Sequence, residues 1–382
     1  MMIFYVKYLV MNMNKVYYVS TTPSEINGTG IGYKIYKQIE IMKKNGFDVT
    51  ELCLKKEISK VKNMLSKLPF VDYRADYSLL KQIEDDSIIY IRYFLMNYQL
   101  YRWIQKIKQR KNVRIIIELP TYPYDFEYRR YHPYIFKDRV WRNKLKKYVD
   151  KILTFSDDKE IYGIETVNIS NGVDINKIKP RIPMKQIDNT INIIAVAKFS
   201  FWHGYDRMIQ GLANYNKTSS NSQKIIFYIV GYGDDEVSGY YNRLIKENNL
   251  EDMVILTGKL YGSALDELYN KCELAVDSMG RHRSEVVYNS SLKGKEYLAK
   301  GLPIISGVKT ELDDTDVSFY MRVPADDTPV DIQKVIAFYQ TVYNGNEPEA
   351  LISEIRTYCE KHFDIEKCFM PVIELIKGYE GG

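Results

Sequence analysis

A lysine and a glutamate lie three residues apart in the stretch 290–300, which has the pattern of a helix. Residues three apart share a helix face, so Lys293 and Glu296 project to the same side. Ser290 or Ser291 can cap this helix, and the free amides of its first turn can meet phosphate oxygens. A cation beside phosphates and a carboxylate that accepts ribose hydroxyls would suit a nucleotide, whereas a surface ion pair explains the same spacing.

A second pair of basic side chains, Lys198 and His203, lies between an apolar run and a helical pattern. Cations at the carboxyl end of a strand, beside a helix N-terminus, suit a diphosphate. Gly231 lies at the end of another apolar run, where a glycine lets a ligand approach the backbone. A solvated turn is the alternative for Lys198 and His203, and a tight strand-to-helix turn is the alternative for Gly231.

Three alternating glycines, Gly28, Gly30 and Gly32, follow the first apolar run and precede a helical pattern. Glycines let backbone amides approach a ligand, and the start of a helix favours an anion. The third glycine comes too early for a dinucleotide-binding fingerprint. Two interpretations therefore remain, a phosphate or sugar contact and a flexible turn.

Carboxylates provide two catalytic candidates, Glu118 and Asp125, and no metal site. Glu118 ends an apolar run and could orient or deprotonate an acceptor hydroxyl, although a strand-end carboxylate also often caps a loop. The DxD-like run Asp314–Asp316 lies in a late polar segment, which we interpret as a solvated loop. The four cysteines and four histidines are scattered without zinc-ligand spacing, so we expect no metal and a reducing cytoplasm.

The elements that must position these residues alternate along the chain, with short apolar runs between longer amphipathic ones. This alternation predicts parallel sheets covered on both faces. The expected strands are 15–20, 49–54, 88–93, 113–118, 151–155, 166–169, 191–197, 225–230, 253–257, 274–277 and 303–306; the expected helices are 32–45, 98–109, 139–149, 205–215, 236–247, 263–271, 291–300 and two within 349–378.

The pattern restarts after a polar, proline-containing stretch near 178–190. We therefore predict an α/β protein with two Rossmann-like, doubly wound domains that face a cleft. The first domain covers residues 1–180 and the second covers 181–364. A C-terminal helix at about 365–382 is expected to pack back on the first domain.

In their order and spacing these segments resemble the retaining glycosyltransferase family 4, whose members have the GT-B fold. Asn171-Gly172-Val173-Asp174 is similar to the Asn-Gly-Val-Asp that precedes the linker in that family. Glu296 is similar to the second glutamate of the family's Glu-x7-Glu motif, which binds the nucleotide ribose. Lys293, Glu296 and Gly301-Leu302-Pro303 resemble the variant found in enzymes of surface polysaccharide synthesis.

The resemblance implies a metal-independent, hexosyltransferase-like enzyme that retains the anomeric configuration. It also implies that the first domain binds the acceptor and that the second domain binds the nucleotide-sugar. The nucleotide-sugar is a substrate rather than a cofactor, with a UDP-sugar favoured over a GDP-sugar. Lys198 stands where the family usually has an arginine and His203 where it has a lysine, and both would hold the donor diphosphate. The donor-binding residues would be Lys198, His203, Gly231, Arg283, Ser290, Ser291, Leu292, Lys293 and Glu296, with Gly28, Gly30 and Gly32 as an acceptor or phosphate loop.

The chain also departs from the family. Tyr288 stands where the first glutamate of the paired motif belongs, which removes the usual contact to the donor sugar. Glu285 lies nearby and could substitute for it. The histidine that the family often has near the sugar in its first domain is not apparent.

The charge of the chain is unevenly distributed. Residues 1–180 hold 32 Lys/Arg and 20 Asp/Glu, a balance of +12, and residues 181–382 hold 22 and 29, a balance of −7. Residues 101–147 alone carry 14 basic and 4 acidic side chains, with aromatic residues between them. Such a stretch suits an anionic membrane interface or RNA, but no RNA-binding signature accompanies it.

We therefore expect a cytoplasmic protein, peripheral at the inner face of the cell membrane. Its acceptor is expected to be a saccharide or lipid-linked saccharide, for capsule or surface polysaccharide synthesis. The apolar start, residues 1–12, is too short to span a bilayer and lacks a signal-peptide cleavage site. Two alternatives stay open. One is a sugar-nucleotide epimerase on the same fold, and the other is a basic membrane- or nucleic-acid-binding protein with a vestigial donor site.

Overall fold

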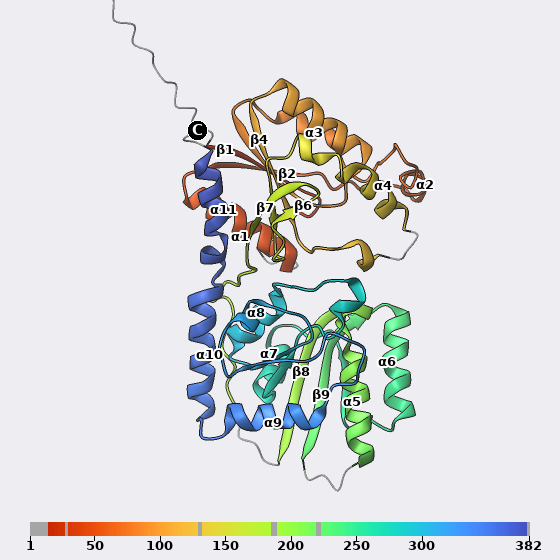
Figure 1. The fold of residues 1–382 in the computed structure, drawn as a ribbon, viewed down its shortest axis with the longest axis vertical. Helices are drawn as coiled ribbons and strands as arrows, with labels where there is room; N and C mark the ends of the chain where they lie inside the picture. The colour runs from red at the N-terminus through yellow and green to blue at the C-terminus, as the bar shows by residue number, and fades with distance from the viewer. Residues whose placement is uncertain (1–13, 27–29, 129–131, 185–188, 219–222, 380–382) are drawn as a thin grey trace, which may run out of the picture. The chain divides into compact units, whose positions relative to one another are not determined.

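The computed structural model describes residues 14–26, 30–128, 132–184, 189–218 and 223–379. The chain divides into two compact units (Figure 1). The first unit comprises Met1–Tyr122, Tyr128–Ser170 and Cys368–Gly382, and the second comprises Pro123–Glu127 and Asn171–Lys367. The predicted apolar start, Gly28, Arg129 and Arg130 lie outside the described residues.

A seven-stranded sheet with the order β2-β1-β3-β4-β5-β7-β6 forms the centre of the first unit. All neighbours are parallel except β6, which pairs antiparallel with β7. Strands β1, β3 and β4 are almost entirely buried, as expected for parallel strands that are covered on both faces. The strands are β1 Lys15–Ser20, β2 Asp48–Cys53, β3 Ser87–Arg92, β4 Val113–Leu119, β5 Lys151–Thr154, β6 Glu160–Ile161 and β7 Ile164–Asn168.

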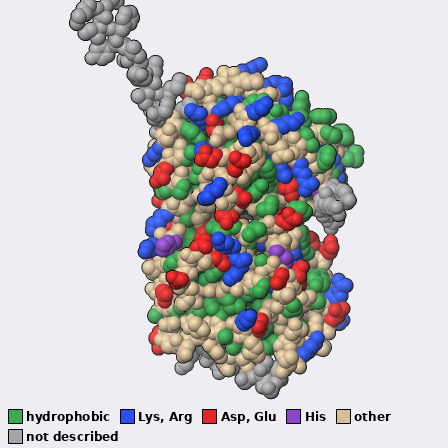
Figure 2. Space-filling view, in the orientation of Figure 1, with side chains coloured by type: hydrophobic (Ala, Val, Ile, Leu, Met, Phe, Trp, Pro, Cys, Tyr) green, Lys and Arg blue, Asp and Glu red, His purple; other side chains and the backbone are tan. Residues whose placement is uncertain are grey.

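The helices of the first unit connect these strands. They are α1 Gly30–Lys44, α2 Lys60–Leu65, η1 Tyr77–Gln82, α3 Tyr98–Arg110, α4 Pro133–Arg142 and η3 Leu145–Lys147, where η marks a 3₁₀-helix. Helix α2 has no buried residue, and Figure 2 shows hydrophobic side chains gathered over it, on the right of the view. Helix α11, Ile365–Gly378, contributes residues 368–378 to this unit.

The second unit contains a six-stranded, fully parallel sheet with the order β10-β9-β8-β11-β12-β13. The order reverses between β8 and β11, as in a doubly wound Rossmann sheet. Its strands are β8 Thr190–Phe199, β9 Lys224–Gly233, β10 Val254–Gly258, β11 Leu274–Val276, β12 Ile304–Ser306 and β13 Tyr320–Arg322.

A single hydrophobic core joins this sheet to helices α5, α6 and α9, through residues such as Ile193, Leu212, Tyr241 and Val335. The elements outside the sheet are η2 Asp125–Glu127, η4 Phe201–His203, α5 Tyr205–Thr218, α6 Asp235–Glu247, α7 Gly262–Lys271, η5 Arg281–Ser284, α8 Leu292–Lys300, η6 Glu311–Asp314, α9 Ile332–Tyr343 and α10 Pro348–Phe363.

Both units are built on sheets that are parallel apart from β6 and are connected by helices, which confirms the predicted α/β class with two Rossmann-like, doubly wound parts. One predicted helix, 139–149, is wrong. The helix starts at Pro133, because the fixed backbone angle of proline suits the first helical position, and it ends at Arg142. Residues 145–147 then form a separate 3₁₀ turn.

Candidate functional site

The predicted donor residues gather at the carboxyl edge of the sheet in the second unit. Strand β8 ends at Phe199, β9 ends at Gly233 and β11 ends at Val276, and helix α8 begins at Leu292. The strand order reverses between β8 and β11. Open α/β sheets bind ligands beyond the carboxyl ends of their strands at such a point.

The loops that follow β8 and β11 approach each other closely through glycine. Gly204 has a φ of +64°, and a Cβ added there would lie 2.5 Å from the amide nitrogen of Gly280. The amide of Met279 also donates to the carbonyl oxygen of His203 at 2.7 Å. The two loops therefore form one packed edge beside the point where the strand order reverses.

Lys293, in the first turn of α8, reaches a buried carboxylate. Its Nζ lies 3.3 Å from Oδ1 of Asp277 and donates to Oγ of Ser278 at 3.1 Å. Burial would raise the pKa of Asp277, but Lys293 and hydrogen bonds from Ser291 and Ser278 bring it below its ordinary value. Burial lowers the pKa of Lys293, which Asp277 partly opposes. The result is an ion pair that holds an ammonium group beside the start of α8.

Asp277 was not among the sequence-predicted residues. The signal that could have found it is its position directly after the buried strand β11, which places its side chain at the carboxyl edge of the sheet. The spacing of Lys293 and Glu296 within one helix carries no information about the strand end that this helix meets.

Glu296 lies one turn further along α8 and has a different environment. Its side chain is partly buried, and within the described part of the chain it makes no hydrogen bond or ion pair. Burial raises its pKa from 4.5 to about 7, and Lys293 and Lys300 oppose this only in part. A carboxyl group with a perturbed pKa and free acceptor oxygens is typical of a functional site.

The two predicted serines have different roles. Ser291 is the N-cap of α8, and its hydroxyl accepts from the amide of Gly294 at 3.3 Å. The hydroxyl of Ser290 accepts from the amide of Asn171 at 2.8 Å and donates to Glu311. Ser290 is thus already used to hold the segment that begins at Asn171, so the structure gives its side chain a structural role instead of a free hydroxyl for phosphate.

His203 is neutral rather than cationic. It is buried, and its Nδ1 accepts from the amide of Ser200 at 2.9 Å as part of a capping box. Burial, followed by the charges of Lys293 and Arg281, lowers its pKa well below the ordinary value. The sequence-based assignment of His203 as a second cation for the diphosphate is therefore corrected. Because Nδ1 accepts a hydrogen bond, the ring proton is on Nε2, which is a neutral donor.

Lys198 remains the exposed cation at the end of β8, and its Nζ lies 5.7 Å from the ring centre of Tyr232. Gly231 lies on the neighbouring strand with a φ of +120°. A Cβ at this position would lie 1.8 Å from the carbonyl oxygen of Ala197. The close approach of β8 and β9 is thus enough to require glycine without a ligand. The cause is a contact between neighbouring strands, and not the tight strand-to-helix turn that the sequence offers as the alternative.

Arg283, in η5, is engaged by carboxylates of its own unit. It forms a two-point ion pair with Asp206, at 2.8 and 2.7 Å, and its Nε donates to Asp327 at 2.7 Å. The hydrogen bonds to these two carboxylates raise its pKa further, although burial opposes this. In this structure Arg283 fastens η5 to α5 and to the loop before α9, and its guanidinium is not free for a donor.

The remaining donor candidates lie around the start of α8. Leu292 is the first residue of the helix and is partly exposed. Tyr288 pairs with Lys309 in an isolated parallel bridge. Glu285 is exposed, in a left-handed backbone conformation with a φ of 57°. Asp314 is also exposed, and Lys309 pairs with it at 3.4 Å, so the DxD-like run lies at the surface as expected.

Glu118, the predicted catalytic residue, is completely buried within the first unit. Gln38 donates to it at 2.7 Å, Tyr90 and Arg92 also bind it, and Nζ of Lys34 lies 3.8 Å away. Burial raises its pKa, but Arg92 and Lys34 bring the pKa below its ordinary value. A carboxylate with no exposed surface cannot contact an acceptor, so the structure places Glu118 at the centre of a buried charge cluster instead.

Lys34, the cation near Glu118 in this cluster, also has a shifted pKa. It is buried in α1, 3.8 Å from the ring centre of Phe155. Burial lowers its pKa to about 7, with Glu118 opposing and Arg92 adding to the decrease. The pair of opposite charges therefore lies inside the unit, where the sequence shows only a helix face and a strand end.

The glycine loop is described in part. Gly28 lies outside the described residues, Gly30 is the exposed first residue of α1, and Gly32 is buried within the first turn. A Cβ added at Gly30 would meet nothing within 4 Å. The position of Gly30 at a helix start fits both interpretations of this loop.

The basic stretch 101–147 is partly internal. Lys137 and Arg142 are buried, and Arg142 pairs with Asp138 at 3.0 Å. Lys108 and Arg114 share Asp150, at 2.6 and 3.3 Å. The excess of positive charge counted from the sequence therefore overstates the charge that this stretch offers to a partner.

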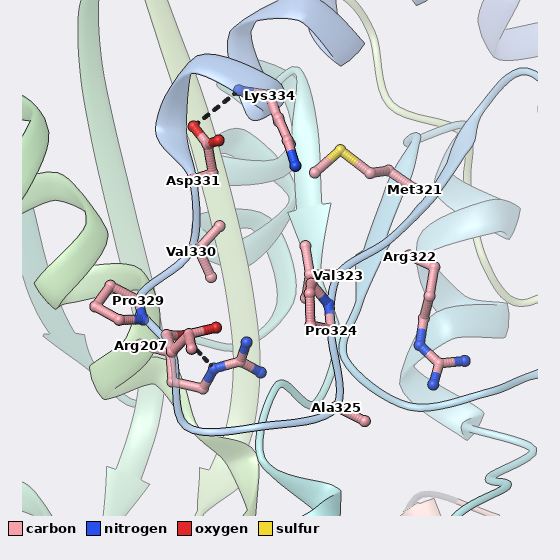
Figure 3. Close-up of a pocket in the computed structure, with 11 residues that line it drawn as sticks. Arg207, Met321, Arg322, Val323, Pro324, Ala325, Pro329, Val330, Asp331 and Lys334 are labelled. Atoms are coloured by element: carbon pink, nitrogen blue, oxygen red, sulfur yellow. Dashed lines mark hydrogen bonds between the residues drawn. The ribbon is translucent and has the colours of Figure 1, made fainter.

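A cavity of about 500 Å³ lies beside β13 and the start of α9 (Figure 3). Arg207 lines it, and its guanidinium donates to the carbonyl oxygens of Thr328 at 2.8 Å and Met279. None of the predicted donor residues lines this cavity. Arg207 links the loops that follow β11 and β13, so we interpret it as a structural residue.

Neither a membrane span nor a metal cluster occurs among the described residues. No helix within them is long and apolar enough to cross a bilayer. No group of three or more of their His, Cys, Asp or Glu side chains is arranged to hold a metal ion.

No protein-family model and no curated protein matches the sequence. The structure, however, resembles solved glycosyltransferases. A glycosyltransferase from Rickettsia africae has 13% identity and a TM-score of 0.61 over 96% of this chain and 99% of its own. Sucrose-phosphate synthase from Thermosynechococcus elongatus has 14% identity and a TM-score of 0.65 over 95% and 98%. Anabaena Alr3699/HepE, in complex with UDP, has 13% identity and a TM-score of 0.62 over 95% and 100%. At these identities the likeness establishes the fold, which is the GT-B glycosyltransferase fold that the sequence predicts.

Proposed function

We propose that this protein is a glycosyltransferase that uses a UDP-sugar donor. The observation that carries the proposal is the arrangement of Lys293, Asp277 and Glu296 on α8 and the end of β11, where the strand order reverses. The fold likeness to Alr3699/HepE, solved with UDP, supports the choice of nucleotide.

In this proposal different residues of the second unit bind different parts of the donor. Lys293, fixed by Asp277, and the exposed Lys198 neutralise the diphosphate, and the first amides of α8 add hydrogen bonds. His203 contributes a neutral Nε2–H donor. Glu296 accepts the ribose hydroxyls, for which its unpaired oxygens are suited. These groups stabilise the charge that develops on the leaving UDP, without a metal.

The finer parts of the proposal rest on the family-4 resemblance. The sugar is transferred with retention at the anomeric carbon to a hydroxyl of a saccharide, which we propose to be lipid-linked, in capsule or surface polysaccharide synthesis. The protein would act at the cytoplasmic face of the membrane, with basic residues of 101–147 near anionic lipids.

The donor assignment is tested by calorimetric titration with UDP. Glu296→Ala should abolish measurable binding, whereas Glu267→Ala, an exposed carboxylate on α7, should bind as the wild type does. Unchanged affinity of the Glu296→Ala variant would refute the ribose assignment.

A panel of sugar nucleotides separates the alternative functions. Slow release of UDP from one of them, by hydrolysis in the absence of acceptor, supports a transferase. An isomerised sugar without nucleotide release would support the epimerase. No thermal shift with any nucleotide would support a binding protein with a vestigial site.

A further inference from the structure

The segment around α2 exposes an unusual number of large apolar side chains. Val61 is 62% exposed, Met64 61%, Leu65 36%, Leu68 51% and Phe70 63%, and no residue of α2 is buried. We call these five residues the α2 patch. Figure 2 shows hydrophobic side chains gathered at this place. Apolar groups that cluster on a surface mark a site of interaction, whereas isolated ones do not.

Specific contacts hold the α2 patch in its exposed position. The buried ammonium of Lys137, on α4, donates to the carbonyl oxygens of Ser66 and Val71, both at 2.7 Å. The hydroxyl of Tyr134, also on α4, donates to the carbonyl oxygen of Asn63 at 3.2 Å. Hydrogen bonds from α4 thus hold the backbone of this segment, and its apolar side chains face the solvent.

Positive charge surrounds the same side chains. Lys60, Lys62 and Lys67 are exposed, and none forms an ion pair within the described residues. The sequence from 59 to 71 contains no aspartate or glutamate. The α2 patch is therefore an apolar surface with three exposed lysines in the same segment, which complements a surface that is apolar beneath an anionic layer.

We propose that the α2 patch inserts into the interface of an anionic lipid membrane. Its apolar side chains would enter the boundary between headgroups and acyl chains, and the three lysines would contact lipid phosphates. A second copy of the chain is a poorer occupant, because a symmetric contact would bring each patch with its lysines against the same lysines. Single-stranded nucleic acid is poorer as well, since the patch is mainly aliphatic and bases stack on aromatic rings.

This inference deepens the membrane contact in the proposed function and rests on it only for its biological purpose. Charge alone distinguishes residues 101–147, and the α2 patch lies outside them. It adds an apolar component, which predicts binding that high salt does not remove completely. The test needs neither donor nor acceptor, so a failure of the transferase proposal would not affect it.

The test is sedimentation of the full chain with vesicles of phosphatidylcholine, with and without phosphatidylglycerol. The variant Met64→Ser/Phe70→Ser should lose about tenfold or more in partition coefficient, from the apolar area it removes. Ile182→Ser/Met184→Ser, at side chains of 71% and 61% exposure in the second unit, is the matched control and should bind as the wild type does. Lys60→Gln/Lys62→Gln/Lys67→Gln should weaken binding at low salt and leave the high-salt binding in place.

A depth measurement distinguishes insertion from electrostatic contact. In the Phe70→Trp variant the added emission should shift to the blue with anionic vesicles and be quenched by lipids brominated on their acyl chains. Wild-type binding by the Met64→Ser/Phe70→Ser variant, or no quenching in the Phe70→Trp variant, would overturn the proposal. It would also be overturned if the chain ignored vesicles and instead formed a dimer that the Met64→Ser/Phe70→Ser variant dissociates.

Discussion

Glu296 should make the protein less stable as the pH rises, and the Glu296→Gln variant should not share this loss. The carboxyl group has an ordinary pKa of 4.5, and its pKa rises to about 7 in the folded chain because it is buried on α8. Between these two values the unfolded chain has lost the proton and the folded chain keeps it. The folded state therefore binds more protons, and the free energy of unfolding falls as the pH rises through this window.

The size of the effect follows from the two pKa values. The pKa rises from 4.5 to about 7, and each pH unit of this rise corresponds to about 1.4 kcal/mol. The free energy of unfolding of the wild type is therefore about 3 kcal/mol lower above pH 7 than below pH 4.5. Glutamine carries no proton to lose, so the variant should gain about 3 kcal/mol relative to the wild type over this window.

The assay is urea unfolding of both proteins at about pH 5 and about pH 8. The difference in unfolding free energy between variant and wild type should grow in favour of the variant at the higher pH. Glu267→Gln, an exposed carboxylate on α7, is the control and should follow the wild type. A difference that is equal at both pH values, or that favours the variant more at low pH, would refute the reasoning.

Three further predictions follow from other parts of the structure. Arg92→Ala should lower the free energy of unfolding by about 3–5 kcal/mol, because it leaves the carboxylate of Glu118 buried without its main partner. Adding Glu118→Gln should recover part of that loss in chemical denaturation, and no recovery would contradict the pairing. Gly231→Ala should destabilise by more than about 2 kcal/mol, since its Cβ would meet a carbonyl oxygen at 1.8 Å. Gly239 lies in α6, and a Cβ added there would meet nothing within 4 Å, so Gly239→Ala should instead stabilise the protein by about 1 kcal/mol in chemical denaturation. Lys198→Ala should weaken UDP binding by about tenfold in calorimetry and leave the melting temperature unchanged, because the side chain is exposed. A fall in both the UDP affinity and the melting temperature would show that Lys198 has a structural role.

The sequence predicts those features that depend on neighbours along the chain. Alternating apolar runs are enough for the two parallel sheets, and the spacing of Lys293 and Glu296 is enough to place both on the first turns of one helix. The cap by Ser291 follows from the preference of serine for that position. These are local properties, and the structure has them as predicted.

Features that depend on distant parts of the chain could not be predicted in this way. The low pKa of the buried Glu118 results from Arg92 on β3 and Lys34 on α1, which are far from it in sequence. The neutral state of His203 results from the depth of its turn and from Lys293 on another element. Burial and distant charged partners together decide the charge of each group here. A single sequence shows burial only through patterns that these polar residues interrupt, and it does not show the partners.

Basic composition was also a poor guide to surface charge. Lys137 counts as a cation in the sequence, yet its ammonium is buried against two carbonyl oxygens. Conversely, Phe70 and its neighbours interrupt no expected pattern, and their exposure emerges only from the packed structure.

The division of the chain into units has a consequence for synthesis on the ribosome. Residues 368–378 of helix α11 belong to the first unit, where Phe369 contacts Tyr90 and where Val372, Ile373 and Ile376 are buried. The core that they complete is otherwise assembled from residues before 171. During translation the first unit must therefore wait, with this part of its apolar core uncovered, while nearly 200 residues of the second unit are made. A chaperone that binds exposed apolar surface on nascent chains is therefore expected to stay bound longest to the half of the protein that is synthesised first.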